Sequence, residues 1–111
     1  MPDDAIPPLP GMLDLLVLQV VSVEPEHGWG VGQRLQAMSG GAFDVNQGSL
    51  YPALQRLLKQ GWIASEWRST ESGRRARYYR ITRSGERQLA RERAGWRRRV
   101  RAVDLVLGGA G

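Results

Sequence analysis

Apolar residues recur with helical spacing in the first half of the chain and predict three helices before residue 60. The first apolar stripe consists of Leu13, Leu16, Val17 and Val20. Further apolar positions widen this stripe on its flank, so we expect the first helix to be buried on more than one side. Pro25 should end this helix near Val23, because helical conformation is disfavoured immediately before a proline.

The second predicted helix is short and rich in glycine. Its apolar positions are Val31, Leu35 and Met38. Gly30 and Gly32 lie inside it, although glycine in a helix costs roughly 1 kcal/mol relative to alanine. We therefore expect another helix backbone to cross close by. Gly40 and Gly41 should end the second helix.

The third predicted helix starts with "QGSLYP" and then adopts a regular leucine spacing. Its inward positions are Leu50, Leu54, Leu57 and Leu58. Asn46 is expected to be the N-cap, Pro52 is expected in the first turn, and Gly61 should end the helix. The start of this helix is unusual because small, polar and aromatic residues replace the usual helix formers there.

After Gly61 the pattern alternates, which predicts a β-hairpin. The expected strands are "WIASEW" and "ARYYRI", joined by the long basic segment "RSTESGRR". The expected core residues are Ile63, Trp67, Tyr79 and Ile81. Tyr78 and Arg80 should point outward, and Trp62 is interpreted as a packing residue like Trp67, not as a platform for base stacking.

The last predicted helix runs from about residue 83 to residue 107, with Thr82 as its cap. Its seam consists of Leu89, Trp96, Val100, Val103 and Leu107, spaced almost as a heptad repeat. A helix of about 25 residues is about 37 Å long, which exceeds the core of a small domain. We expect the seam to pack on a second chain; the alternative is a monomer with a free tail.

The order helix, helix, helix, strand, loop, strand, helix predicts a mainly α fold with a small β-hairpin, namely a winged helix-turn-helix followed by a long C-terminal dimerisation helix. Residues 1–10 are expected to be a flexible arm and residues 11–82 the DNA-binding domain. Residues 83–107 are expected to be the dimerisation helix and residues 108–111 a flexible tail.

Charge is distributed unevenly along the 111 residues, whose formal net charge is +5. Residues 68–101 contain 13 Arg against three acidic residues. Such a segment favours a polyanion as partner, because neutralising phosphates releases counterions. The alternative interpretation is a solvated helix face in a protein from a GC-rich genome.

Several classes of protein are disfavoured by the composition. The chain has no Cys, so disulfides and thiolate sites are excluded, and no apolar run is long enough to span a membrane. The first residues do not form a secretory signal, and we expect a cytoplasmic protein. His27 is the only histidine and is expected to fix a turn. The segment "GWGVG" lacks the preceding strand and the Lys of a phosphate-binding loop. We therefore expect no metal site, no cofactor and no enzymatic activity.

Two segments are candidates for contact with double-stranded DNA. On the third helix the candidates are Gln47, Gly48, Ser49, Tyr51, Pro52, Gln55, Arg56 and Lys59. On the hairpin tip they are Gly73, Arg74, Arg75 and Arg77. A recognition helix presents its N-terminal residues to base edges, while a basic wing can contact the backbone or a minor groove.

"LDLLVLQVVSVEPEHGWGVGQRL", "VNQGSLYPALQRLLKQGWIASEW" and "GRRARYYRITRSGERQL" together resemble the PadR family of bacterial transcriptional regulators, over about residues 11–96. The resemblance implies a winged-helix domain, a helical dimerisation element and, usually, repressor activity. It also implies that the recognition helix starts at Gln47, Ser49, Tyr51 and Pro52, and that Gly73, Arg74 and Arg75 form the wing.

Two further expectations concern partners. The dimer interface is expected to contain Leu13, Leu16, Leu89, Trp96, Val100, Val103 and Leu107. Some PadR members bind phenolic acids or flat aromatic drugs at the dimer centre, and Trp96 is the candidate stacking residue, although a lone Trp on such a seam more often packs. The alternative function is a winged-helix protein–protein adaptor whose Arg-rich last helix binds an acidic partner.

Overall fold

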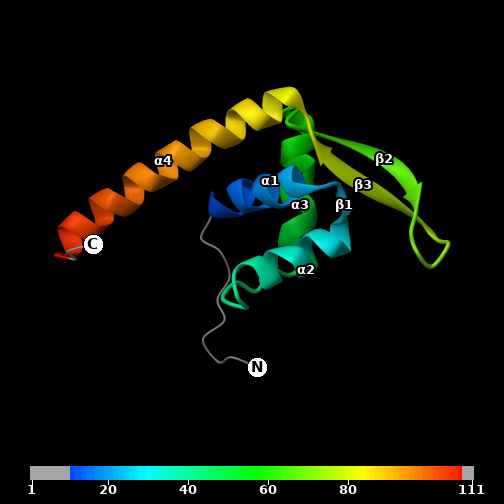
Figure 1. Ribbon diagram of the computed structural model, residues 1–111, viewed down its shortest axis with the longest axis horizontal. Coiled ribbons are helices and arrows are strands. Elements are labelled where there is room, and N and C mark those ends of the chain that lie inside the picture. The colour runs from blue at the N-terminus through cyan, green and yellow to red at the C-terminus, as the bar shows by residue number, and fades with distance from the viewer. Residues whose placement is uncertain (1–10, 109–111) are drawn as a thin grey trace.

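A computed structural model describes residues 11–108 and confirms the predicted winged-helix class with a long C-terminal helix (Figure 1). The elements are α1 (Met12–Val23), β1 (Glu26–His27), α2 (Gly28–Met38), α3 (Gln47–Lys59), β2 (Ile63–Ser69), β3 (Arg75–Ile81) and α4 (Arg83–Leu107). The expected arm at residues 1–10 lies outside the described residues, as do residues 109–111 of the expected tail.

Helix α1 is the centre of the hydrophobic core, and it contacts α2, α3, α4 and β3. Its buried residues are Leu13, Val17, Leu18, Val20 and Val21. These positions surround much of the helix circumference, as the wide apolar stripe predicted. The inward face of α3 completes the core with Leu50, Ala53, Leu54 and Leu57, whereas Leu58 is only partly buried.

The hairpin belongs to a three-stranded antiparallel sheet in the order β1-β3-β2. The two-residue strand β1 was not predicted; Glu26 pairs with Tyr79, and His27 pairs with Tyr78. The loop between β2 and β3 spans only residues 70–74, so it is shorter than the sequence suggested. Arg75 and Arg77 are strand residues, and Gly73 supplies the left-handed conformation of the turn with φ +85°.

Trp67 is not a core residue, contrary to the prediction. Its side chain is 60% exposed, whereas Ile63 and Tyr79 at the base of the hairpin are 2% and 3% exposed. Ile81 is partly buried and packs against the core. All four residues share one face of the hairpin, but the strands extend beyond the helices, so only the residues near the base reach the core.

Another helix backbone was expected to cross close to the glycines of α2, and this prediction was wrong. The atoms nearest to these glycines belong to side chains. A Cβ atom at Gly28 would lie 2.8 Å from the phenol oxygen of Tyr51. A Cβ atom at Gly30 would lie 2.5 Å from the Glu26 carboxylate. Because Gly28 and Gly30 have no side chains, an aromatic ring from α3 and an acidic side chain from β1 can pack against the backbone of α2.

A junction of four elements fixes the start of α4 against the end of α3. The Thr82 hydroxyl donates to the carbonyl of Gly61 at 2.7 Å and accepts the N–H of Gly85 at 3.1 Å, which confirms Thr82 as the cap. The backbone N–H of Thr82 donates to the carbonyl of Trp62 at 3.0 Å. Gly85 lies so close to this Trp62 carbonyl that a side chain there would overlap the oxygen.

Helix α4 contributes to the core only near its beginning. Leu89 is 7% exposed, whereas Val103 is 53% and Leu105 is 80% exposed. Figure 1 shows the rest of the helix extending away from the body of the fold. Among the described residues, no helix is both long and apolar enough to cross a membrane.

We expect Gly85→Ala to lower the free energy of unfolding by about 1–3 kcal/mol, because the new methyl group must displace the Trp62 carbonyl. Gly95→Ala, in the same helix, is the matched control. Its Cβ would meet nothing closer than the Arg98 guanidinium at 3.9 Å, so the higher helix propensity of alanine should stabilise the protein by up to about 1 kcal/mol. Urea unfolding of both variants measures the difference; equal effects would contradict the packing at Gly85.

Candidate nucleic-acid interface

The first turn of α3 is open to solvent and firmly capped. The side-chain oxygen of Asn46 accepts the N–H of Ser49 at 2.8 Å, which confirms Asn46 as the N-cap. All the α3 residues predicted to contact DNA are exposed: Gln47, Gly48, Ser49, Tyr51, Pro52, Gln55, Arg56 and Lys59. A helix N-terminus of this kind presents free N–H groups and a positive dipole end, which favour anions such as phosphate.

Pro52 lies in the second turn of α3, not in the first as predicted. The cap at Asn46 makes Gln47 the first helical residue, so Pro52 is inside the helix. It has no N–H to donate to the carbonyl of Gly48, four residues earlier. The exposed front of α3 therefore has one helical hydrogen bond fewer than a regular helix, and the Gly48 carbonyl is available to accept another donor.

Tyr51 and Arg56 are both exposed, but each also has a contact within the chain. The Tyr51 ring lies over Gly28, so it connects α3 to the start of α2. Arg56 donates to both carboxylate oxygens of Asp14 on α1, at 3.0 and 2.7 Å. These hydrogen bonds raise the pKa of the Arg56 guanidinium. Arg56 is thus part of a helix–helix ion pair, which competes with any contact to DNA.

The basic residues of the wing divide between the two faces of the hairpin. The register places Ser65, Trp67, Arg75 and Arg77 on the face whose base enters the core at Ile63 and Tyr79. On this face the Arg77 guanidinium donates to the Ser65 hydroxyl at 2.8 Å. The Arg75 guanidinium lies 5.5 Å from the ring centre of Trp67, within cation–π distance. Arg74 and Gly73 are in the exposed loop.

The opposite face of the hairpin is electrostatically paired. Glu66 lies 3.0 Å from Arg68 and 3.5 Å from Arg80. The hydrogen bond from Arg68 and the charges of both arginines hold the pKa of the Glu66 carboxyl below its ordinary value. The Arg68 guanidinium also lies 5.4 Å from the ring centre of Tyr78. The two faces thus differ: one presents arginines without carboxylate partners, and the other neutralises part of its charge.

His27 has a structural position, as the sequence suggested. Its Nδ1 accepts the N–H of Gly30 at 3.0 Å, which caps α2, and its ring meets Tyr78 edge-on. The neighbouring Glu26 binds Arg34 at 2.7 Å. Within residues 11–108 no three His, Asp or Glu side chains are grouped as metal ligands.

The residues predicted for a dimer interface separate into three groups by burial. Leu13 and Leu89 belong to the core of the chain itself, so they are not available to a partner as predicted. Leu16 is partly buried against that core. The remaining residues of the predicted seam are exposed on α4: Trp96, Val100, Val103 and Leu107.

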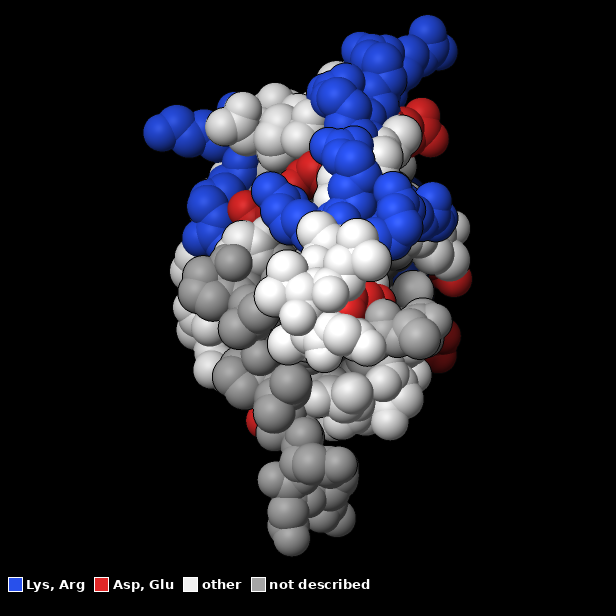
Figure 2. Space-filling view, turned by 90° about the vertical axis from the view of Figure 1, so that its left-hand side faces the viewer, with Lys and Arg blue, Asp and Glu red and all other residues white. Residues whose placement is uncertain are grey.

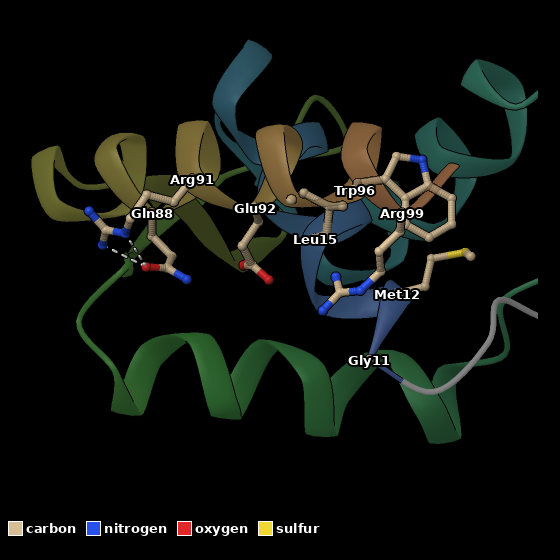
Figure 3. Close-up of a pocket in the computed structure, with 9 residues that line it drawn as sticks. Gly11, Met12, Leu15, Gln88, Arg91, Glu92, Trp96 and Arg99 are labelled. Atoms are coloured by element: carbon tan, nitrogen blue, oxygen red, sulfur yellow. Dashed lines mark hydrogen bonds between the residues drawn. The ribbon is translucent and has the colours of Figure 1, made fainter. Parts of the chain in front are cut away.

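A groove of about 640 Å³ lies beside this seam, between the first residues of α1 and the middle of α4 (Figure 3). Met12, Leu15 and Trp96 supply its apolar lining. Its polar lining includes Glu92 and Arg91, whose guanidinium donates twice to the Gln88 side chain. The groove therefore combines one exposed aromatic ring with charged side chains.

Comparison with known proteins identifies the family to which this winged-helix fold belongs. The model of the transcriptional regulator PadR-like family matches residues 17–91 of the chain, more than half of its length. The chain belongs to the PadR-like family of transcriptional regulators. The resemblance inferred from the sequence motifs is thereby confirmed.

Solved PadR-like structures have the same fold. A PadR family regulator from Eggerthella lenta is 32% identical, with a TM-score of 0.73, and the match covers 87% of this chain and 82% of that one. A PadR-like regulator from Bacillus cereus is 28% identical, with a TM-score of 0.76 and coverage of 89% and 94%. An uncharacterized protein from Lysinibacillus sphaericus is 26% identical over 99 residues, which are 89% of this chain and 91% of that protein.

Two features of this candidate interface were missed in the sequence. Trp67 faces the same side of the wing as Arg75 and Arg77, which the hairpin register would have indicated had the loop length been known. The ion pair of Asp14 and Arg56 joins residues 42 positions apart, and nothing local in the sequence signals it.

We expect Asn46→Ala to lower the free energy of unfolding by about 1 kcal/mol and to loosen the first turn of α3 in particular, because the Ser49 N–H loses its side-chain acceptor. Hydrogen exchange at the Ser49 amide should accelerate more than exchange at Leu57. Asn46→Asp keeps an acceptor at the cap and should behave like the unmodified protein. Equal exchange at Ser49 in all three proteins would show that the cap does not order this turn.

Proposed function

We propose that this PadR-like regulator is a homodimeric repressor that recognises a specific double-stranded DNA sequence. The observation that carries the proposal is the combination of a capped, exposed α3 N-terminus with a hairpin that presents arginines without carboxylate partners. Base edges are read by side chains at the start of a recognition helix, and phosphates are bound by basic side chains beside it.

The proposed roles of individual residues follow from their chemistry. Gln47 can pair with adenine through its amide, and the Ser49 hydroxyl can serve several bases. Gly48, Tyr51, Pro52, Gln55 and Lys59 complete the proposed contact surface of α3. On the wing, Gly73 shapes the loop, and Arg74, Arg75 and Arg77 bind the backbone. Arg56 is the least favoured of the predicted DNA contacts, since its Nε and Nη2 groups donate to the carboxylate of Asp14, which also neutralises its charge.

The proposed dimer is supported by the apolar residues that α4 exposes. Trp96 and Val100 are each 38% exposed, and Val103 and Leu107 are 53% and 76% exposed, so the described residues leave a substantial part of the apolar seam open to solvent. A second copy would cover the seam with the same residues, as in an isologous interface. Two recognition helices would then address half-sites about one helical turn apart.

Repression would follow from occupation of a promoter by this dimer. A small aromatic ligand, if the repressor has one, would act in the groove beside Trp96, because that groove adjoins the seam that sets the spacing of the two recognition helices. The charged lining of the groove favours a ligand that carries polar groups. The alternative adaptor function predicts no binding to random duplex DNA at low salt, whereas the repressor should bind it.

Selection of bound sites from a random DNA pool tests the proposed function directly, and it should yield a sequence with two related half-sites. In gel shifts with that sequence, we expect Arg75→Ala with Arg77→Ala to weaken binding to every duplex and to reduce the salt slope by about two units. Arg68→Ala with Arg80→Ala removes the same charge from the other face of the hairpin and is the matched control.

A loss of affinity as large in the control pair as in the Arg75 and Arg77 pair would contradict the assignment of the DNA-facing side of the wing. Gln47→Ala and Ser49→Ala should differ from both pairs, since each should relax the sequence preference at particular base pairs by about 1–3 kcal/mol.

For the dimer, we expect Val103→Asp to shift the mass in sedimentation experiments from dimer toward monomer, because it places a carboxylate in the apolar seam. Ala102→Asp adds the same charge one residue away, outside the seam, and should remain dimeric. A monomeric mass of the unmodified protein at micromolar concentration would overturn the proposed dimer.

A further inference from the structure

The net positive charge of the chain comes entirely from α4. Residues 83–107 contain eight Arg and three acidic residues, whereas the rest of the chain contains eight basic and eight acidic residues. The part that carries the recognition helix and the wing is thus formally neutral. The surplus of +5 is carried by a helix that the proposed reading of an operator does not use.

Five of these arginines form a stripe on α4, which we call the outer face. It consists of Arg83, Arg87, Arg91, Arg98 and Arg101. At 3.6 residues per turn these side chains fall within roughly a quarter of the circumference, opposite Leu89 and Trp96. All five are exposed, and none forms an ion pair with a carboxylate in residues 11–108. In Figure 2, Lys and Arg side chains cluster in the upper part of the molecule.

The outer face is unfavourable for the isolated helix. Arg83, Arg87 and Arg91 follow one another at intervals of four residues, and like charges at this spacing repel each other on a helix surface. The Arg91 guanidinium is held by the Gln88 amide, not by an acid. A face that served only for solvation would be more stable with alternating signs, so the unpaired stripe indicates a polyanionic partner.

The outer face also lies far from the proposed operator-reading surface. Thr82 and Gly85 fix the start of α4 to Gly61 and Trp62, at the C-terminal end of α3. The capped end of α3 lies at the opposite end of a 13-residue helix, about 20 Å away. Because Leu89 turns toward the core, most of the stripe points away from the body of the fold, and only Arg91, at its edge, also lines the groove beside Trp96. A duplex segment bound at Ser49 is thus separated from the start of α4 by the length of α3.

We propose that the outer face of α4 is a second DNA-binding surface, which holds the phosphates of another duplex segment without regard to its sequence. The stripe from Arg83 to Arg101 extends about 27 Å, comparable to eight phosphates along one strand. Arginine suits this contact because its planar fork matches phosphate oxygens. The dimer bound to an operator thereby bridges two segments of DNA. The operator-bound end of this bridge rests on the proposed function.

The experiment uses two duplexes and the full chain. An immobilised duplex that contains the selected operator is loaded with protein, and the amount of bound protein is measured. A labelled duplex without the operator is then added at 0.1 M salt, and its capture is measured. We expect capture that falls by about 500-fold between 50 and 200 mM salt if all five arginines contact phosphate.

The test variant replaces all five outer-face arginines by Gln, which is also a good helix former. It should load on the operator within about threefold of the unmodified protein, since charges farther away than about 10 Å are screened at this salt. The amount of labelled duplex that it captures should be at least about a hundredfold lower than with the unmodified protein. Replacement of the same five residues by Lys keeps the charge and should retain most of the capture.

The outcomes separate the two proposals. Specific loading without capture, or with equal capture by the Gln variant, overturns the second surface and leaves the proposed function intact. Loading without sequence preference, together with capture that the Gln variant loses, contradicts the proposed repressor but supports the second surface. Displacement of the captured duplex by poly-glutamate as efficiently as by DNA of equal charge would identify an acidic protein as the partner and overturn the proposal.

Discussion

The junction between α3, the hairpin and α4 determines how the rest of the molecule is arranged. The Gly61 carbonyl accepts hydrogen bonds from the hydroxyls of Thr82 and Ser84, and the adjacent Trp62 carbonyl accepts the Thr82 N–H. The same two carbonyls thereby close the base of the hairpin and begin the last helix. Since α3 ends at this point as well, the recognition helix, the wing and α4 have fixed mutual orientations.

This arrangement separates two kinds of surface. The capped end of α3 and one face of the wing lie on the neutral part of the chain, while the surplus positive charge lies on α4. Recognition of a sequence depends on hydrogen bonds at short distance, whereas attraction to phosphate depends on charge. Under the proposed function and the proposed second surface, this separation would allow the sequence preference and the general affinity for phosphate to change independently.

The elements of the fold could be predicted because their signals are local. Apolar periodicity, the caps Asn46 and Thr82 and the stop at Gly61 lie within a few residues of the boundaries that they set. The strand β1 has only two residues, so it has no periodicity to detect. The position of Trp67 was wrong because alternation assigns a residue to a face of a strand but does not say how far the helices cover that face.

The candidate site was less predictable than the fold, because several of its contacts join residues that are far apart in the sequence. That Gln47 and Ser49 would be exposed followed from the leucine stripe of their own helix. Pro52 is the sixth residue of α3 after the correctly predicted cap at Asn46, so its place in the second turn follows from that cap and the prediction of the first turn was wrong. That Leu13 and Leu89 lie in the core, although they were predicted for a dimer interface, depends on packing between α1 and α4. These helices are about 70 residues apart in the sequence and carry no local sign of their contact.

The stacking of Arg75 on Trp67 and the hydrogen bond from Arg77 to Ser65 have a consequence for the strength of binding. A free arginine side chain loses up to about 2 kcal/mol of conformational entropy when it is immobilised. On this wing part of that loss occurs when the protein folds, so it is not repeated when a ligand arrives. Under the proposed function, Trp67 and Ser65, which carry no charge themselves, would therefore strengthen binding by the arginines beside them.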